Sequence, residues 1–315
     1  MCAEPVAGAT YLLGNLYTIT EESSDVLVYT GHGPYDLSHR IHVDGMLAVD
    51  IATSYVDICV YVLDNGNGRV SRIDQKHNTD TFIDGLERGS LLSMSVNRDG
   101  RLTILQRNSR ILTYGRDGRV LGDRRAPIED ILHAVEIDEK TSVFCDARGC
   151  VKTTYGRQEA ACKLDEIGCR YVDMNKNGDL IACDLSEHQV VKLNPKTLQV
   201  IATLLTLERD GIESPRHVRC VLENGLMLVS WLHFLDVYTF RRNTTQGYLA
   251  SPAHDIRNQR IREASEIERE IVLSPAFQQL SKTSGIEFDV TPSQPQQLEQ
   301  PATASAGKNT CIYPK

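Results

Sequence analysis

Residues 171–193 read YVDMNKNGDLIACDLSEHQVVKL, and they contain one complete copy of the unit from which most of this chain is built. A first apolar segment ends at the turn 175–178, where Asn-Gly supplies the positive φ values that a tight hairpin requires. A second segment, Leu180–Asp184, ends at an aspartate. A polar link follows, and then a third apolar segment, Gln189–Leu193, which is expected to run back along the second. This order of short apolar segments, turn and link predicts consecutive antiparallel strands.

The same unit recurs about every forty residues along the chain. Further copies are Val60–Asp64 with Arg69–Ile73, Leu102–Gln106 with Arg110–Tyr114, and Ser142–Asp146 with Cys150–Lys152. Successive spacings of 42, 40, 38 and 46 residues separate the positions that close the second strand, which are Asp64, Gln106, Asp146, Asp184 and Ser230. This period accommodates four short strands with their turns, whereas solenoid repeats are shorter or helical. It therefore predicts a β-propeller.

Six such units can be counted, so we predict an all-β fold, a six-bladed β-propeller within residues 1–245. The units are residues 17–43, 46–83, 91–125, 131–164, 171–207 and 217–240. A circular array must close on itself, and we expect Ala9–Leu13 to do this by adding an outer strand to the last blade.

The composition changes after the propeller. Residues 246–282 are expected to form a linker and one amphipathic helix, because Ile261, Ala264, Ile267 and Ile271 recur at helical spacing. That helix has two open roles, packing on the flank of its own domain or binding a separate partner. Residues 283–315 are rich in Pro, Gln, Ser, Thr and Ala, so burial cannot offset their ordering entropy, and we predict a disordered tail.

Charge and apolar patterning limit the location and partners of the protein. The formal net charge of −8 disfavours nucleic acid and anionic membranes as partners of the surface as a whole, and no DNA partner is expected. No apolar run is long enough to cross a bilayer, so no membrane association is predicted. The first twenty residues lack a basic start followed by an apolar run, which predicts a cytoplasmic protein.

The nine cysteines are interpreted as reduced thiols, several of them in the core. Cys145, Cys150, Cys162 and Cys169 are separated by gaps of four, eleven and six residues, which fit no paired zinc-binding spacing. The sequence therefore predicts no metal site and no cofactor.

The recurrent aspartate followed by a polar link and Arg-Val or Gln-Val resembles the NHL-repeat family of six-bladed β-propellers. Asp64 with Arg69-Val70 and Asp184 with Gln189-Val190 are the best matches, and the resemblance covers residues 45–240. The chain is similar to uncharacterised invertebrate NHL-domain proteins that carry the propeller without catalytic domains. The resemblance implies a binding role, since NHL propellers of tripartite-motif proteins bind RNA or proteins. Fold alone does not assign function.

We interpret the repeated aspartates Asp64, Asp146 and Asp184 as structural. A carboxylate at a strand end can accept N–H bonds from the loop that follows it, which would organise each blade in the same way. A catalytic group is normally needed once, so repetition favours architecture.

The third blade is the sharpest local deviation in charge. Residues 98–125 contain eight arginines and three aspartates, a charge of +5 against −13 for the remainder. The candidate contact residues for RNA or a protein partner are Arg107, Arg110, Tyr114, Arg116, Arg119, Arg124 and Arg125. Arginine suits phosphates, and Tyr114 could stack on a base. The alternative is that these arginines pair with acidic neighbours across blade edges.

His133 and His217 each open a blade near its innermost strand, so we predict that they face the central channel or its mouth. His39 and His42 face opposite sides of an extended strand, so they are poor co-ligands. Asp50, Asp173 and Glu136 lie near the expected inner strands but form no recognisable catalytic motif.

The function that these observations favour is a non-catalytic scaffold that binds a protein partner through a propeller face. Two alternatives stay open, RNA binding through the arginine-rich third blade and metal-dependent hydrolysis of the lactonase or esterase type in the central channel. The sequence favours a protein that is not an enzyme, without deciding the question.

Overall fold

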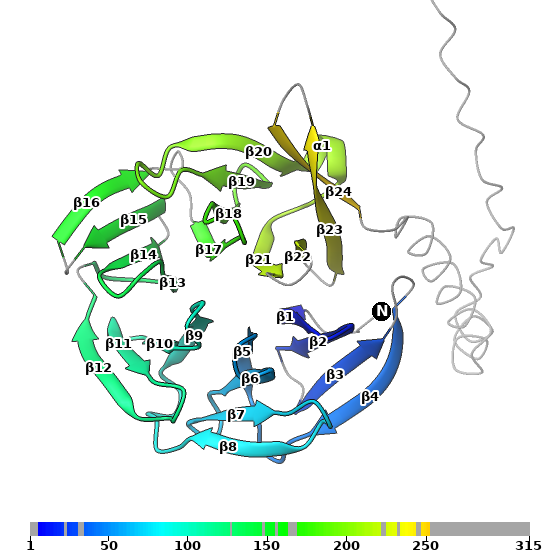
Figure 1. Cartoon of the computed structure of the whole chain (residues 1–315), viewed down its shortest axis with the longest axis vertical. Helices are drawn as coiled ribbons and strands as arrows, with labels where there is room; N and C mark the ends of the chain where they lie inside the picture. Colours follow the sequence, from blue (N-terminus) through cyan, green and yellow to red (C-terminus); the bar gives the residue numbers. More distant parts are fainter. Residues whose placement is uncertain are drawn as a thin grey trace, which may run out of the picture. The chain divides into compact units, whose positions relative to one another are not determined.

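The computed structural model describes residues 6–21, 24–30, 35–126, 128–146, 149–154, 157–162, 169–221, 225–231, 234–243 and 247–252. In this part of the chain the strands form six four-stranded antiparallel sheets around a centre (Figure 1). The structure thus confirms the all-β, six-bladed propeller. The predicted helix and tail lie outside the described residues.

Within every blade the four strands follow one another from the centre outward in chain order. Blades 1 and 2 are β1 (Val6–Leu12), β2 (Asn15–Thr20), β3 (Asp25–Thr30), β4 (Asp36–His42), and β5 (Ala48–Ser54), β6 (Cys59–Asp64), β7 (Arg69–Ile73), β8 (Thr79–Ile83). Blades 3 and 4 are β9 (Leu91–Val96), β10 (Leu102–Gln106), β11 (Arg110–Tyr114), β12 (Val120–Arg125), and β13 (His133–Glu136), β14 (Thr141–Asp146), β15 (Gly149–Thr154), β16 (Arg157–Cys162). Blades 5 and 6 are β17 (Cys169–Met174), β18 (Leu180–Asp184), β19 (Gln189–Leu193), β20 (Val200–Thr206), and β21 (Pro215–Val221), β22 (Leu226–Trp231), β23 (Phe234–Asn243), β24 (Gly247–Pro252). One helical turn, α1 (Leu207–Asp210), lies between β20 and β21.

Ring closure differs from the prediction, and the assignment of Ala9–Leu13 to the last blade is wrong. These residues fall within and just after β1, which is the innermost strand of blade 1 and pairs with β2. Blade 6 takes its outer strand from its own chain segment, because β24 pairs with β23. The physical reason is burial: β1 is buried along almost its whole length, as an inner strand must be. The last strand ends at Pro252, beyond residue 245 where we expected the propeller to end.

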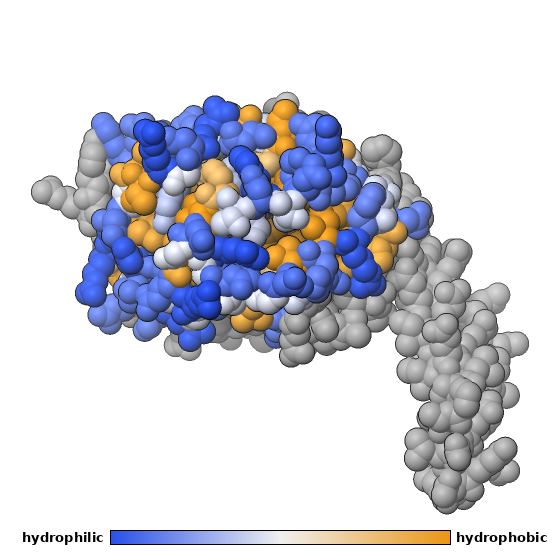
Figure 2. Space-filling model, turned by 90° about the horizontal axis from the view of Figure 1, so that it is seen from below, coloured by the Kyte–Doolittle hydropathy of each residue, from blue (hydrophilic) through white to orange (hydrophobic). Residues whose placement is uncertain are grey.

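Burial falls from the second strand to the outer strand in blades 1, 2, 3 and 5. Strands β6, β10, β14 and β18 are buried at every position, whereas β12 is mostly exposed and β4 is exposed at all but one residue. Apolar side chains of neighbouring sheets fill the space between the blades; Tyr61 and Leu63 of blade 2, for example, belong to one core cluster with Met94 of blade 3. One side of the molecule accordingly shows hydrophilic side chains with smaller apolar areas between them (Figure 2).

The antiparallel order gives the propeller two faces. The turns that join first to second and third to fourth strands lie on one face, here called the front face. The links between second and third strands, each opened by a residue such as Asp64 or Asp184, lie on the back face. These definitions place the site described next.

Candidate functional site in the central channel

Equivalent positions of five inner strands carry the residues of a buried polar cluster. Each pairs with a residue near the end of the second strand of its blade: Asp50 with Leu63, Ser93 with Leu105, His133 with Cys145, Tyr171 with Cys183, and His217 with Ser230. All five are buried. The repeat thus brings one side chain per blade to the same level of the ring, and we call these five residues the inner ring.

The aromatic members of the inner ring stack on one another. Tyr171 lies between the two histidines, with ring centroids 3.6 Å from His133 in a stacked arrangement and 4.1 Å from His217 in a tilted one. His133 is 0% and His217 2% exposed. Of the two predicted placements, the central channel or its mouth, the mouth does not fit, because packing on Tyr171 encloses both rings.

Asp50 accepts hydrogen bonds from four other residues, and His217 Nε2 also lies 3.5 Å from its Oδ1. Its Oδ1 accepts the backbone N–H of Ile51 at 2.7 Å, and its Oδ2 accepts that of Met94 at 2.7 Å. The Tyr171 hydroxyl donates to the same carboxylate at 3.1 Å, and Arg219 Nη2 lies 3.3 Å from Oδ1. Arg219 Nη2 also donates to the Ile51 carbonyl at 2.9 Å and contacts the Tyr171 hydroxyl. The result is a closed network that joins blades 2, 3, 5 and 6.

Burial and charge set the protonation of this network. Burial alone would raise the pKa of Asp50, but the hydrogen bond from His217 and the charge of Arg219 outweigh it and lower the pKa. Burial would lower the pKa of Arg219, but Tyr171, Asp173 and Asp50 raise it, so the guanidinium stays charged. Burial lowers the pKa of His133 to about 3 and also lowers the pKa of His217. The network therefore holds an ion pair beside two neutral imidazoles.

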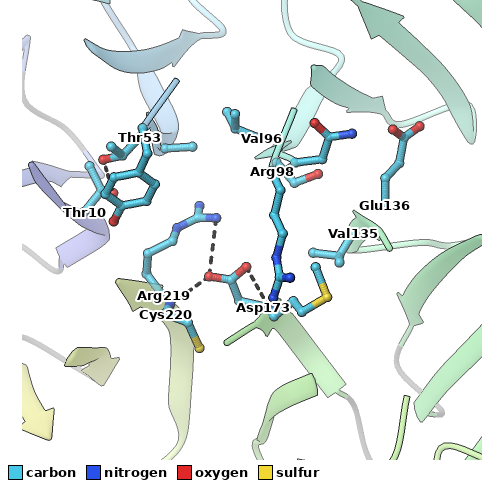
Figure 3. Close-up of a pocket in the computed structure, with 14 residues that line it drawn as sticks. Thr10, Thr53, Val96, Arg98, Val135, Glu136, Asp173, Arg219 and Cys220 are labelled. Carbon is cyan, nitrogen blue, oxygen red and sulfur yellow. Dashed lines mark hydrogen bonds and ion pairs between the residues drawn. The ribbon is translucent and has the colours of Figure 1, made fainter. Parts of the chain in front are cut away.

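A cavity of about 90 Å³ lies next to this network, toward the front face. Its walls include side chains that lie two residues after the inner ring on the same strands, such as Ser95, Asp173 and Arg219. Figure 3 shows Arg219 and Asp173 pointing toward one another, with Thr10 and Thr53 across the cavity. The Asp173 carboxylate accepts the N–H groups of Cys220 and Met174, each at 2.8 Å, and lies 3.8 Å from Arg219 Nη1. Burial raises the pKa of Asp173.

Arg98 reaches over the cavity from the turn between β9 and β10. Its Nη2 donates to the carbonyls of Asn175 and Lys176, at 3.0 Å each, in the turn between β17 and β18. One side chain thus connects the front-face turns of blades 3 and 5. Glu136 lines the same cavity and accepts the Thr113 hydroxyl at 3.3 Å.

The channel carboxylates are poor candidates for a metal centre. Asp50 and Asp173 already accept several protein donors each, which leaves few lone pairs for a cation. Within the described residues, one group of three potential metal ligands has all its donor atoms within 4.8 Å of one another. This group is Cys145, Cys150 and Cys169. The spacing argument missed this group because it considered ligands close in sequence, whereas neighbouring strands bring distant ones together.

Most arginines of the third blade have partners. Arg110 pairs with Asp123 at 2.7 Å within the blade, and Arg116 pairs with Asp57 of blade 2 at 2.6 Å. The remaining ion pairs of predicted contact residues join Arg119 to Asp117 at 3.4 Å and Arg124 to Glu136 at 3.6 Å. Arg107 and Arg125 are exposed. The blade is therefore rich in arginine but largely neutralised by nearby carboxylates.

Tyr114 does not offer a stacking surface, and that part of the prediction is wrong. Its side chain is 6% exposed and packs in the core between blades 2 and 3 with Leu102 and Leu112. The reason is the alternation of β11, which puts Leu112 and Tyr114 on the face that packs against blade 2, whereas Ile111 faces blade 4.

The repeated aspartates lie at the back face, away from the cavity. Asp64 accepts the N–H groups of Leu47 and Asn67, both at 3.1 Å, and pairs with Arg69 at 3.1 Å. Asp184 accepts the N–H groups of Ser186 and Glu187 at 3.3 Å. Asp146 is buried at the end of β14. Asp64 and Asp184 thus organise the link that follows their strands.

Sequence reasoning missed Tyr171, Arg219 and Arg98 as parts of one site. The repeat did contain a signal for Tyr171. When the blades are aligned on the residue that closes the second strand, Asp50, His133 and Tyr171 fall at equivalent positions of the inner strands. Arg98 gave no such signal, because its partners are backbone carbonyls 77 and 78 residues away.

No protein-family model and no curated protein matches the sequence. Solved structures share the architecture at low identity. Selenomethionine-substituted virginiamycin B lyase from Staphylococcus aureus has a TM-score of 0.57 at 10% identity, covering 79% of this chain and 84% of that one. The WD40 β-propeller domain of Doa1 has a TM-score of 0.55 at 10% identity, covering 78% and 95%. The nidogen/laminin complex gives 0.52 at 16% identity, covering 66% and 82%. These similarities support the β-propeller fold, and the NHL resemblance stays a prediction.

Proposed function

We propose that this protein is a non-catalytic binding scaffold that holds a protein partner on the front face, around the mouth of the central cavity. The observation that carries the proposal is a pair of exposed apolar side chains at adjacent front-face turns. Leu13 is 50% exposed between β1 and β2, and Ile58 is 39% exposed between β5 and β6. Exposed apolar groups beside a pocket are typical of protein-binding surfaces.

The backbone at these two residues strengthens the proposal. Leu13 has φ +49° and Ile58 has φ +50°, in the left-handed region that glycine and asparagine adopt more easily. A bulky apolar residue held there, exposed to water, gains nothing for folding that asparagine would not supply. Unfavourable conformations of this kind cluster at functional sites.

The turns that carry Leu13 and Ile58 are fixed to one another and to the cavity. The hydroxyls of Thr10 and Thr53 lie 2.7 Å apart, and the Tyr55 hydroxyl donates to the Tyr11 carbonyl at 3.3 Å. Thr10, Thr53 and Tyr55 also line the cavity. Two exposed apolar side chains on turns fixed beside a polar cavity suit a partner that inserts one polar side chain and covers the turns with apolar ones.

The size of the cavity favours a side chain over a cofactor. Its volume of about 90 Å³ is well below the roughly 300–1,000 Å³ of typical small-molecule sites. Hydroxyls of Thr10, Thr53 and Ser95 and the Arg98 guanidinium offer hydrogen bonds. The lining holds two cationic side chains, Arg98 and Arg219, and two carboxyl groups, Asp173 and Glu136. These features support recognition of a neutral polar group.

The two alternatives have weaker support. RNA binding needs free cations and a stacking ring, yet Arg110, Arg116 and Arg124 pair with carboxylates and Tyr114 is buried. Metal-dependent hydrolysis needs acidic ligands with free lone pairs and a base that reaches substrate. In the described channel, Asp50 is saturated by donors and His133 is enclosed.

The experiment compares partner capture by variants of the tagged full chain, in nuclease-treated and untreated halves of one lysate. Leu13→Asn and Ile58→Asn remove the apolar side chains while suiting the left-handed backbone. Each should raise the free energy of unfolding by about 1 kcal/mol, measured by denaturant titration, and weaken partner recovery. Ser109→Asn is the matched control, because Ser109 has φ +57° but lies in a back-face link.

The outcomes separate the alternatives. A partner that survives nuclease, is lost with the two front-face variants and is retained with Ser109→Asn supports the scaffold. Recovery that depends on intact RNA would favour RNA binding, and recovery unchanged by both front-face variants would refute the proposed surface.

A further inference from the structure

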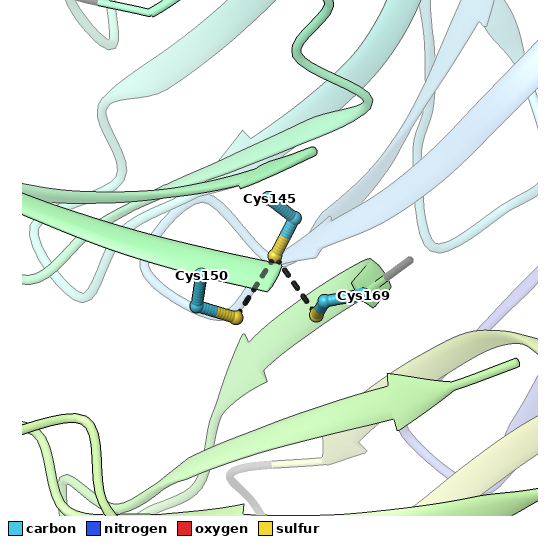
Figure 4. Close-up of side chains that lie close together, drawn as sticks. All are labelled: Cys145, Cys150 and Cys169. Atoms are coloured by element: carbon cyan, nitrogen blue, oxygen red, sulfur yellow. Dashed lines mark hydrogen bonds between the residues drawn. The ribbon is translucent and has the colours of Figure 1, made fainter. Parts of the chain in front are cut away.

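Three cysteine side chains from two blades meet between blades 4 and 5 (Figure 4). Cys145 lies near the end of β14, Cys150 lies opposite it in β15, and Cys169 begins β17. The Cys145 sulfur is 3.5 Å from that of Cys150 and 3.1 Å from that of Cys169. All three sulfurs lie within 4.8 Å of one another.

The surroundings of this cysteine triad are apolar and closed to solvent. Each of the three residues is 0% exposed, and Val135, Val143 and Val172 belong to the same core cluster. A buried cysteine normally behaves as a small apolar residue that packs against carbon. Other buried cysteines of this chain, such as Cys59 and Cys220, belong to different core clusters. Packing alone does not require three thiols to converge on one point.

The triad is close in size to a coordination sphere. Metal–thiolate bonds of about 2.3 Å in a tetrahedral site place the sulfurs about 3.8 Å apart. The sulfurs of the triad lie 3.1 and 3.5 Å apart, with all three within 4.8 Å, so they would need to separate by less than about 1 Å to bind one cation. We propose that Cys145, Cys150 and Cys169 bind a soft, thiol-seeking metal cation, Zn²⁺ or Cu⁺, that joins blade 4 to blade 5.

The donor set explains the choice of cation. Three sulfurs without a nitrogen or oxygen ligand favour soft cations over Mg²⁺, Ca²⁺ or Mn²⁺. Binding replaces thiol protons by sulfur–metal bonds, and the released protons pass to solvent, so no oxidant or reductant is required. Zn²⁺ prefers four ligands in structural sites. The β15–β16 register places Cys162 opposite Cys150, which makes Cys162 the residue to vary when the ligands are counted.

The test uses the full-length protein, purified under reducing, metal-free conditions and titrated separately with Zn²⁺ and Cu⁺ against a competing chelator. We expect one cation per chain and a rise in the unfolding midpoint on loading. Cys145→Ala and Cys169→Ala should abolish both effects, and Cys183→Ala, at another fully buried cysteine, should retain them. X-ray absorption of the loaded wild type should show sulfur neighbours at about 2.3 Å.

Two readouts distinguish three ligands from four: the number of sulfur neighbours and the effect of Cys162→Ala on metal binding. The relative affinities for Zn²⁺ and Cu⁺ identify the preferred cation. The absorption measurement keeps the test decisive if a cysteine variant fails to fold. The proposal is overturned if wild type binds neither cation more tightly than Cys145→Ala does. Nitrogen or oxygen neighbours alone around the bound cation would overturn it as well. So would a Cys145–Cys169 or Cys145–Cys150 disulfide in the native protein whose reduced form takes up no metal.

Discussion

The neutral imidazoles of His133 and His217 show how position in the ring sets the chemistry of a side chain. Both occupy an inner-strand position that could have presented a base to a ligand, yet each packs against Tyr171. The charged groups beside them are Asp50 and Arg219, which form an ion pair behind the cavity. The cluster therefore stabilises the centre of the ring and fixes the wall against which a partner side chain would rest.

Stability should fall as the solution is acidified, because of these histidines. In the folded state burial lowers the pKa of His133 to about 3, whereas an unfolded histidine titrates near about 6.5. The neutral form is favoured in the fold, so this contribution is complete above pH about 6.5 and is lost as pH falls below it. His133→Phe should remove roughly 2 kcal/mol of the loss between pH 7 and pH 5, measured by denaturant titration at each pH. Equal losses in wild type and variant would contradict the buried, neutral assignment.

Asp64 shows that a repeated residue can matter for architecture rather than for binding. Its side chain is fully buried and accepts two backbone N–H groups and the Arg69 side chain. Asp64→Ala leaves these donors unsatisfied and should lower the free energy of unfolding by about 2–4 kcal/mol, with partner capture unchanged in the folded fraction. Glu129→Ala, at an exposed position, is the control and should change it by less than about 0.5 kcal/mol. A loss of binding without a loss of stability would assign Asp64 to the interface instead.

Individual strands were predictable where the sequence alternates and the turns are distinctive. The predicted unit Leu91–Arg125 corresponds to β9 through β12, because the turn 97–100 and the apolar residues of β10 are unambiguous. The strands that sequence reasoning misplaced or missed, β1 and β24, sit at the two ends of the propeller. The apolar pattern of β1 fits a strand of either terminal blade, so the pattern alone could not assign this strand to blade 1.

The front-face turns of blades 3 and 5 are predicted to depend on one side chain. Arg98→Ala removes both hydrogen bonds to the carbonyls of Asn175 and Lys176. Amides of the turns 96–101 and 175–179 should then exchange with deuterium roughly tenfold faster, since losing about 1.4 kcal/mol of local stability has that effect. Arg107→Ala, in the same blade and exposed, is the matched control. Equal exchange in the two variants would show that the Arg98 bridge contributes nothing.

Closure of the ring rests on packing, because each described blade is built from consecutive strands and none is shared between the two ends of the propeller. Ala9, Tyr11 and Leu16 of blade 1 pack against Val221 and Leu228 of blade 6. The repeat period predicted the number of blades correctly. The period could not indicate how the ends meet, since that depends on which terminal segment is buried most completely, a property of the assembled ring.

The seam between blades 1 and 6 should therefore open before other parts of the ring. Leu228→Ala removes a fully buried side chain at the seam and should lower the free energy of unfolding by about 2–5 kcal/mol. Hydrogen exchange should rise selectively in β1 and β21. Leu180→Ala, an equally buried residue of the core between blades 4 and 5, should be similarly destabilising without that pattern. A uniform rise around the ring in both variants would mean that the seam is no weaker than other blade contacts.

The most direct measurement is a hydrogen-exchange footprint of the full chain, alone and bound to its nuclease-resistant partner. Binding at the front face predicts protection of the turns 12–15 and 54–59, which carry Leu13 and Ile58, and of the turn 96–102, which carries Arg98. Back-face links, including 64–69 and 184–189, should exchange as they do in the free protein. Protection confined to the back face or to the outer strand β12 would contradict the account.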